Sequence, residues 1–323
     1  MIIKNVYASE QIGDKLIRRM GNCIGLAFVS GFVFNEIVGT VLAFTLGTEI
    51  FSNQGFIWIY QIIFSAIIFT VPFMIIAKPM NVRLSRVCNF AKPKKDITLP
   101  IIFIGMAVCM LANVLGTMAV TVLENLGLSD INSSLDIDTS SPLLVGAGLI
   151  AGSVLPGLVE EFALRGVVMG SLRRFGNRFA IIISAILFGL MHGTLAQAPF
   201  AFVVGLYLGF AAIKTGSVYT AVIIHTLNNL FAFLLDILMG DMTTNTQTIT
   251  SGIYFMVCII LGFVGIYMLK DNKNVFRFKK ADIMKEKTLM QKIGIFFSSP
   301  GIIGLLVYIV LQFASVKIME VLV

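Results

Sequence analysis

Nine long apolar runs, separated by short polar segments, constrain the fold of this chain more than any other feature. They fall at residues 23–46, 56–77, 99–123, 142–168, 179–191, 199–213, 217–239, 252–269 and 293–313. A helix of roughly 20 apolar residues crosses a bilayer core about 30 Å thick. The runs therefore predict an all-α, polytopic bundle of membrane-spanning helices, in which the fifth and sixth runs are short for separate full spans.

The composition excludes several other classes of protein. Of the 323 residues, 57% are hydrophobic and only 13% are charged, whereas a soluble globular chain carries about 25% charged residues. One compact soluble core, a disordered chain and a nucleic-acid-binding domain are all incompatible with these figures. The four cysteines are scattered with no CxxC pair, which argues against a disulfide framework and against a cysteine-built metal site.

The basic residues predict the orientation of the chain. If the runs are spans, every Lys and Arg except Arg165 and Lys317 lies on one side of the membrane, which is 22 of the 24. The opposite loop from Glu124 to Ser141 carries acids and no basic residue. The positive-inside rule then places the N-terminus in the cytoplasm and, with nine spans, the C-terminus outside. We expect a multi-pass protein of the plasma membrane, of bacterial type, whose net charge of +7 reflects topology and contact with the lipid bilayer and requires no nucleic acid.

The runs also divide the chain into four parts. Residues 1–22 are expected to form a cytoplasmic N-terminal segment, followed by a run with no small-residue cleavage site that is interpreted as a retained signal anchor. Residues 23–141 hold the N-terminal helices, and residues 142–239 hold the polar groups described next. Residues 240–323 hold the C-terminal helices and the basic stretch 272–292, which is expected either to lie on the membrane surface or to form a solvated loop. The last run is expected to be an appendage to the core bundle.

Polar groups occur within three of the runs, where each charge costs at least ~2.5 kcal/mol and needs a reason. They are Glu160, Glu161 and Arg165 in the fourth run, His192 in the fifth, and His225, Asn228 and Asn229 in the seventh. A helix rises 1.5 Å per residue, which places Glu161 about 18 Å from Arg173, His192 about 21 Å from Arg178 and His225 about 16 Å from Lys214. The similar depths predict that the three segments bring these groups together.

The spacing within the runs adds detail. Glu161 and Arg165 are four residues apart, so they can form an ion pair on one helix face. Glu160 points about 100° away and has no such partner. His225 and Asn229 share a face in the same way. A free carboxylate, two imidazoles and an amide at one depth are suited to hydrolysis, with a glutamate that activates water and groups that bind a metal or an oxyanion.

Each of these features alone has an ordinary structural explanation. Glu161–Arg165 could be a clamp, and the histidines and asparagines could be hydrogen-bonding groups between helices. Gly189, Gly193, Gly205 and Gly209 are interpreted as close-packing positions, and Phe188 as a residue that sets the rotamer of His192. The alternative function is a non-catalytic membrane scaffold, a bacteriocin-immunity factor, or a proton-coupled transporter that uses Glu and His as a relay. A transporter usually shows repeated halves, and none is visible in the sequence.

Three motifs occur in order along these runs: EExxxR at Glu160, Glu161 and Arg165; FxxxH at Phe188 and His192; HxxxN at His225 and Asn229. Over residues 142–239 the sequence therefore resembles the CAAX protease and bacteriocin-processing family of intramembrane proteases, also called the Abi family, which includes type II CAAX prenyl endopeptidases. The core of that family has eight helices, so a ninth span here would be an addition.

The resemblance implies hydrolysis of a peptide bond in a membrane-associated peptide or protein. Glu160 would be the general base and His192 would hold the attacking water or a metal, with support from Glu161 and Arg165. His225 and Asn229 would hold the oxyanion, or His225 would be a second metal ligand.

The resemblance also bears on the cofactor and the substrate. Zinc held by Glu160, His192 and His225 is favoured by the resemblance, since three ligands leave an open water position. The same groups could also act as a glutamate-dependent protease without a metal. The substrate could be a prenylated tail, a bacteriocin or a signalling peptide, and cleavage of a prenylated tail is the least favoured of these.

Overall fold

The protein is a helical bundle in a computed structural model that describes residues 2–126, 137–139, 141–240, 242–278 and 282–322. Within these residues every regular element is a helix. Seven of the helices are long and apolar enough to cross a membrane, or eight if one bent pair is counted as a span. The predicted all-α, multi-pass fold is therefore confirmed.

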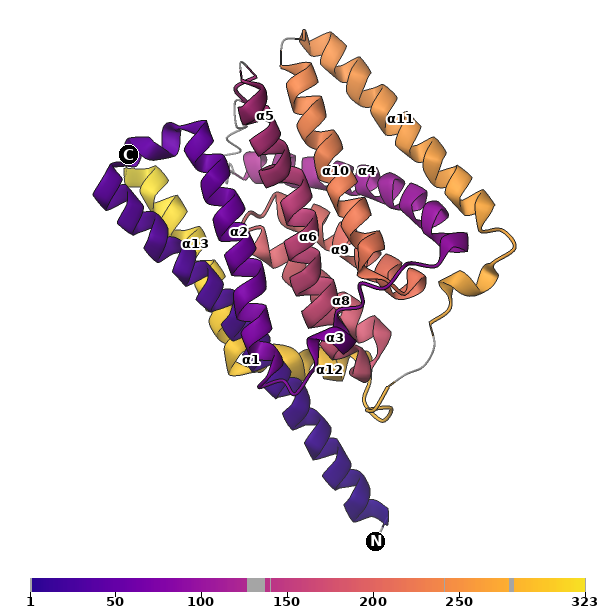
Figure 1. The fold of residues 1–323 in the computed structure, drawn as a ribbon. Coiled ribbons are helices and arrows are strands. Elements are labelled where there is room, and N and C mark those ends of the chain that lie inside the picture. Colours follow the sequence, from indigo (N-terminus) through magenta and orange to yellow (C-terminus); the bar gives the residue numbers. More distant parts are fainter. Residues whose placement is uncertain (1, 127–136, 140, 241, 279–281, 323) are drawn as a thin grey trace.

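The observed helices follow the predicted runs closely (Figure 1). The long helices are α1 Ile2–Leu46, α2 Gln54–Ala77, α4 Lys95–Asn125, α9 Gln197–Thr215, α10 Val218–Met239 and α11 Thr244–Met268, with the shorter α8 Asn177–Met191. The fourth run continues without interruption through α5 Pro142–Leu149, η2 Ile150–Val154, α6 Leu155–Glu161, η3 Phe162–Met169, α7 Gly170–Leu172 and η4 Arg173–Phe175. The remaining elements are η1 Thr48–Ser52, α3 Leu84–Val87, η5 Lys273–Phe276, α12 Leu289–Phe297 and α13 Pro300–Leu322. Of the two runs expected to be short, α9 is long enough to span and α8 is not.

The ninth run is not the single straight span that the sequence suggests. It is divided into α12 and α13, which are bent by 70° relative to each other. Pro300 opens α13, and a proline disfavours the helical conformation in the residue before it, which explains the break. α13 lies along α1 at the edge of the bundle (Figure 1). There the N–H of Gly301 donates to Oδ1 of Asn22 over 2.9 Å.

The first 22 residues are not a separate polar segment, because α1 begins at Ile2 and runs through the expected boundary. Ile17 and Met20 are fully buried, and Asp14 forms an ion pair with Lys287 at 3.3 Å. This end of α1 is therefore packed against the C-terminal part of the chain. Its location in the cytoplasm stays a prediction.

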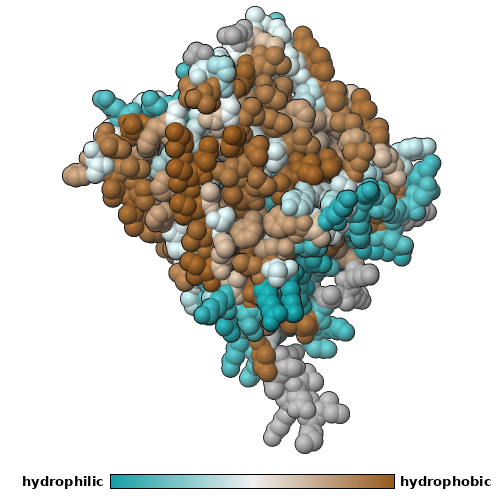
Figure 2. Space-filling model, viewed as in Figure 1, coloured by the Kyte–Doolittle hydropathy of each residue, from teal (hydrophilic) through white to brown (hydrophobic). Residues whose placement is uncertain are grey.

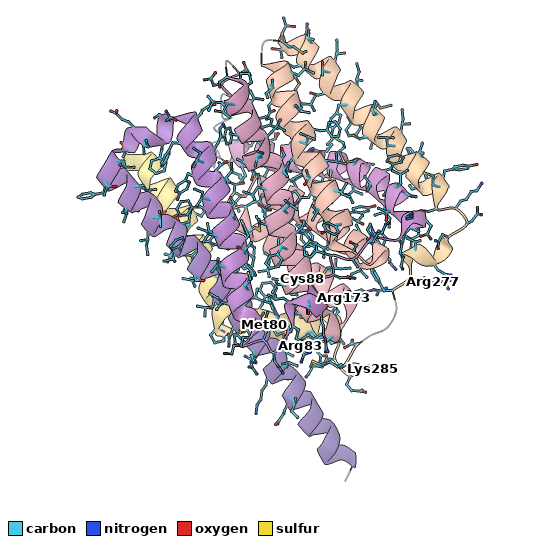
Figure 3. All side chains as sticks on the ribbon, in the orientation of Figure 1. Met80, Arg83, Cys88, Arg173, Arg277 and Lys285 are labelled. Atoms are coloured by element: carbon cyan, nitrogen blue, oxygen red, sulfur yellow. The ribbon has the colours of Figure 1, made fainter. Side chains whose placement is uncertain are left out.

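The surface is divided between apolar and polar zones. Figure 2 shows a broad hydrophobic surface above a hydrophilic zone at the end where α1 begins. Arg83, Arg173 and Lys285 lie at this end in Figure 3, although they come from distant parts of the chain. We call this end, with the basic residues that follow α2, η4, α9 and α11, the basic end of the molecule.

The basic stretch after α11 is docked against the bundle and is not a freely solvated loop, and its contact with the membrane surface stays a prediction. Val275 and Met284 are buried. Nζ of Lys214, at the end of α9, donates to the carbonyl of Arg277, and the N–H of Ile283 donates to the carbonyl of Arg174 over 3.0 Å.

Glycines bring the central helices together. A Cβ on Gly205 of α9 would lie 3.0 Å from the Cα of Ala185 on α8, so these two helices pack backbone to backbone. Gly193 has a different role from the predicted one. It has a φ of +69° and open space around it, so it ends α8 in the left-handed conformation that favours glycine.

Candidate active site

The two neighbouring glutamates lie on a helix that is locally widened. π-helical turns, η2 and η3, precede and follow α6. In η2 the N–H of Leu155 donates to the carbonyl of Ile150, five residues earlier instead of four. Pro156 explains this turn, because a proline inside an α-helix has no N–H and clashes with the carbonyl four residues before it. Widened turns of this kind are frequent at functional sites.

Gly157 brings α6 against α10. A Cβ at this position would lie only 2.1 Å from Oγ1 of Thr226, the residue after His225. Any larger side chain would force the helices apart. The close approach therefore sets the distance between the two glutamates and His225. The sequence analysis did not identify Gly157 or Thr226, although a glycine three residues before Glu160 was a visible signal.

Glu161 is the centre of a buried polar cluster. Its Oε1 accepts a hydrogen bond from Nη1 of Arg165 over 2.7 Å, and both side chains are fully buried. The predicted ion pair is thus confirmed. The same oxygen lies 3.0 Å from Nδ1 of His225, a contact that the sequence analysis did not predict. Arg165 also donates from Nη2 to the carbonyl of Gly205 over 3.2 Å.

The bond to Glu161 fixes the tautomer of His225. A carboxylate paired with a guanidinium can only accept hydrogen bonds, so Nδ1 of His225 carries the proton. In the neutral imidazole, Nε2 is then an acceptor with a free lone pair. Nε2 lies 3.9 Å from Oε2 of Glu160.

Glu160 has a carboxylate oxygen without a partner. Its side chain is 14% exposed, yet Oε2 is buried and makes no hydrogen bond to the described residues. The 3.9 Å between this atom and Nε2 of His225 is too long for a direct hydrogen bond. It is a suitable distance for one water that contacts both. Buried polar atoms without a partner are rare and often mark a catalytic role.

The ring of Phe188 packs against the rings of both histidines. Its ring centroid lies 4.9 Å from that of His192 and 5.5 Å from that of His225, edge to face in both cases. Arg165 places its guanidinium carbon 4.5 Å from the same centroid. Nδ1 of His192 donates to the carbonyl of Phe188 over 2.7 Å, so the Nε2 atom of His192, like that of His225, is left as the free nitrogen.

A cavity of about 850 Å³ lies beside this cluster. His192, Asn228 and Asn229 line it, together with residues of α4, α9 and α11. Nδ2 of Asn228 donates to Oδ1 of Asn229 over 3.1 Å. The structure thus brings Glu160, Glu161, Arg165 and His225 into one buried cluster, and it places His192 and Asn229 on the wall of the adjacent cavity.

The residues predicted as zinc ligands fit a metal only in part. The Glu160 and His225 atoms named above are 3.9 Å apart, which would allow both to lie about 2 Å from one ion. Among the described residues, however, no three His, Cys, Asp or Glu side chains are placed to hold a metal ion, so His192 does not complete the set. Zinc bound by these residues stays a prediction.

The cysteines offer no alternative nucleophile at the basic end. Burial raises the pKa of the Cys88 thiol to about 12, so almost none of it is thiolate at neutral pH. Cys88 packs against η3, where a Cβ on Gly166 would lie 2.9 Å from its sulfur. Its position therefore supports a packing role.

Comparisons with known proteins show which family this segment resembles. The family model described as "Type II CAAX prenyl endopeptidase Rce1-like" matches residues 142–231, the segment that carries all three motifs. A protein of Bacillus subtilis (strain 168) named "Putative membrane peptidase YdiL" is 25% identical over 126 residues. That alignment covers 37% of this chain and 50% of the relative, so the chain spans about half the length of the curated relative it matches. No solved structure matches the chain.

The helices between Pro142 and Met239 therefore combine a membrane-embedded Glu–His–Arg cluster, an adjoining cavity and a match to a family of membrane proteases. The resemblance predicted from the motifs is confirmed. Residues 142–231 are thus similar to the Rce1-like family of type II CAAX prenyl endopeptidases.

Proposed function

We propose that this protein is an endopeptidase that hydrolyses a peptide bond of a membrane-associated peptide or protein. The observation that carries the proposal is the approach of the unpaired Glu160 Oε2 to His225 Nε2, 3.9 Å apart. A carboxylate oxygen that makes no hydrogen bond to the described residues, beside an imidazole held in one orientation, is suited to activating a water molecule. The family of the matched segment supports the same chemistry.

In the proposed reaction Glu160 takes a proton from this water while the water oxygen attacks the carbonyl carbon of the substrate. The carbonyl π electrons move to its oxygen, which becomes an oxyanion. The oxyanion then re-forms the carbonyl bond, the C–N bond breaks, and Glu160 gives the proton to the nitrogen that takes the electrons of that bond. The products are a carboxylic acid and an amine, and base and acid are one residue.

The oxyanion has two candidate partners. Asn229 accepts a hydrogen bond at Oδ1 from Asn228, which leaves its Nδ2 group to donate. His225 can donate from Nε2 only as an imidazolium, because Nδ1 is committed to Glu161. The carboxylate of Glu161 would stabilise that cation, much as the aspartate of a serine-protease triad stabilises its histidine. Arg165 holds the carboxylate of Glu161 in place through its hydrogen bond to Oε1, and His192 would hold the water or the substrate from the cavity wall.

The charge distribution supports an orientation for the enzyme. We propose that the basic end faces the cytoplasm of a bacterial cell and that the protein is a plasma-membrane enzyme. The membrane peptidase match from Bacillus subtilis supports this setting.

The direct test is peptide cleavage by the full-length protein purified in detergent. Membrane peptides of different sequences are incubated with the wild type and the products are identified by mass spectrometry. Glu160→Gln keeps the shape of the side chain and removes the base, so cleavage should be lost. Glu124→Gln removes the same charge from an exposed position at the end of α4, outside the site, and should cleave as the wild type does. Cleavage that survives in Glu160→Gln would overturn the proposal.

A further inference from the structure

The cavity beside the cluster leads away from the basic end. It is lined along α10 by Asn229, Ala232, Asp236 and Met239, which are spaced by three or four residues and so lie on one helix face. α10 starts at Val218, just after Lys214 at the basic end, and finishes at Met239. One continuous face of the helix therefore runs from the predicted oxyanion partner to the opposite end of the molecule.

Among the residues that the structure describes, Asp236 is the only carboxylate on the wall of this cavity. Apart from His192, every other lining residue is uncharged. Asp236 forms no ion pair with the described residues. An acid in such a position attracts a cation from outside the protein.

The rest of the cavity wall does not oppose this attraction. The cavity lies beside α4, α9, α10 and α11, and its wall includes Val120 of α4 and Ser251 of α11. No described residue on the wall is a Lys or Arg. A cleft whose charge has one sign raises the local concentration of ligands of the other sign.

The spacing along α10 sets a distance. Asp236 is seven residues after Asn229, which corresponds to about 10.5 Å along the helix. An extended peptide advances about 3.3 Å per residue, so this span equals roughly three residues. Side chains of Asn113 and Thr117 on α4 and of Gln197 on α9 line the same cavity and are polar groups suited to an extended peptide backbone.

We propose that the site takes cationic peptides that enter from the end opposite the basic end, and that Asp236 binds a lysine, arginine or terminal amine about three residues from the cleaved bond. The proposal rests on the proposed function, since it names the substrate class of that site. Asp236 is a specificity-determining residue in this scheme and takes no part in the chemistry.

The test measures binding and cleavage separately with the full-length protein in detergent. In the binding arm, Glu160→Gln protein is titrated into fluorescent, otherwise uncharged peptides that carry one Lys, Gln or Glu at each position in turn. An ion pair of this kind should make the best Lys peptide bind roughly fivefold more tightly than its Gln counterpart, less so in high salt. Adding Asp236→Asn should remove the preference, and adding Asp236→Lys should shift it to the Glu peptide. Adding Glu124→Gln should change nothing.

In the cleavage arm, wild-type protein is given the same peptides and the cut bond is located by mass spectrometry. The preferred Lys should lie about three residues from that bond. A Lys preference that persists in Asp236→Asn, or cleavage that ignores the Lys position, would overturn the assignment of Asp236 while leaving the protease in place. Binding that depends on Asp236 without any cleavage would instead contradict the proposed function and keep the cation site.

Discussion

His225 donates from Nδ1 to Oε1 of Glu161 over 3.0 Å, and this is the same oxygen that accepts the guanidinium of Arg165. One oxygen of Glu161, Oε1, therefore contacts both a permanent cation and the imidazole that it orients, while Oε2 of Glu161, like Oε2 of Glu160, has no hydrogen-bond partner among the described residues. Groups in this position normally tune a reacting side chain without touching the substrate. The neighbouring Glu160 forms no ion pair with Arg165, so it is the carboxylate left for chemistry.

Glu161→Gln should mainly destabilise the protein. The change leaves Arg165 buried without a counter-charge, which typically costs several kcal/mol, and it weakens the hold on His225. We expect a clearly lower melting temperature in detergent and poor expression. If Glu161→Gln is as stable as the wild type but inactive, the base has been assigned to the wrong glutamate.

Glu160→Gln should have the opposite profile. No hydrogen bond of Glu160 Oε2 is lost, so the melting temperature should stay near that of the wild type. Removal of a general base should reduce kcat by at least ~10²-fold. Peptide turnover and thermal unfolding, measured on one preparation, decide this, with Glu124→Gln as the matched change outside the site. A variant that turns over peptide at the wild-type rate would exclude Glu160 as the base.

Much of the fold follows from the sequence because apolar runs of bilayer length allow few alternatives. The Glu161–Arg165 pair was predictable for a similar reason, since both residues belong to one helix and their spacing fixes the geometry. The bond between His225 and Glu161 was not, because it depends on how closely α6 approaches α10. That approach depends on Gly157, and hydropathy carries no information about it.

Local geometry explains the other differences. The depth estimate assumed straight α-helices, whereas π turns interrupt the helix on both sides of Glu160. Prolines mark two of these differences in the sequence. Pro300 follows the 70° bend before α13, and Pro156 follows the π turn η2. The direction of the cavity could not be read from the sequence, because it depends on the packing of four helices that are far apart along the chain.

Reporter fusions test the predicted orientation. A reporter after Lys95 should lie in the cytoplasm, and one at Asn245 should lie outside, because positively charged loops are retained on the cytoplasmic side. Paired reporters with opposite compartment preferences, such as alkaline phosphatase and a fluorescent protein, give complementary signals at each site. A cytoplasmic signal at Asn245 would reverse the orientation and place the end of the molecule opposite the basic end inside the cell.

Metal analysis tests the predicted zinc ion. The resemblance predicts about one zinc per chain when the protein is purified without chelator, and loss of zinc in His192→Ala and His225→Ala. Only neutral imidazole binds zinc, so the affinity should fall as the solution is made more acidic. Full turnover by protein shown to be free of zinc would contradict the zinc site and leave the reaction to Glu160 and His225.

Gly157→Ala should separate α6 from α10 and so reduce activity without removing any polar group. The added methyl would meet Thr226 Oγ1 at 2.1 Å, far inside van der Waals contact, so the glutamates must move away from His225. Displacements of about 1 Å in a catalytic site can cost about 10²-fold in rate.

Gly152→Ala is the matched control, because a Cβ there comes no closer than 3.9 Å to a neighbour. Thr226→Ala removes the nearest atom and should restore part of the activity of Gly157→Ala. Equal turnover in Gly157→Ala and Gly152→Ala would show that the approach of these two helices does not control the site.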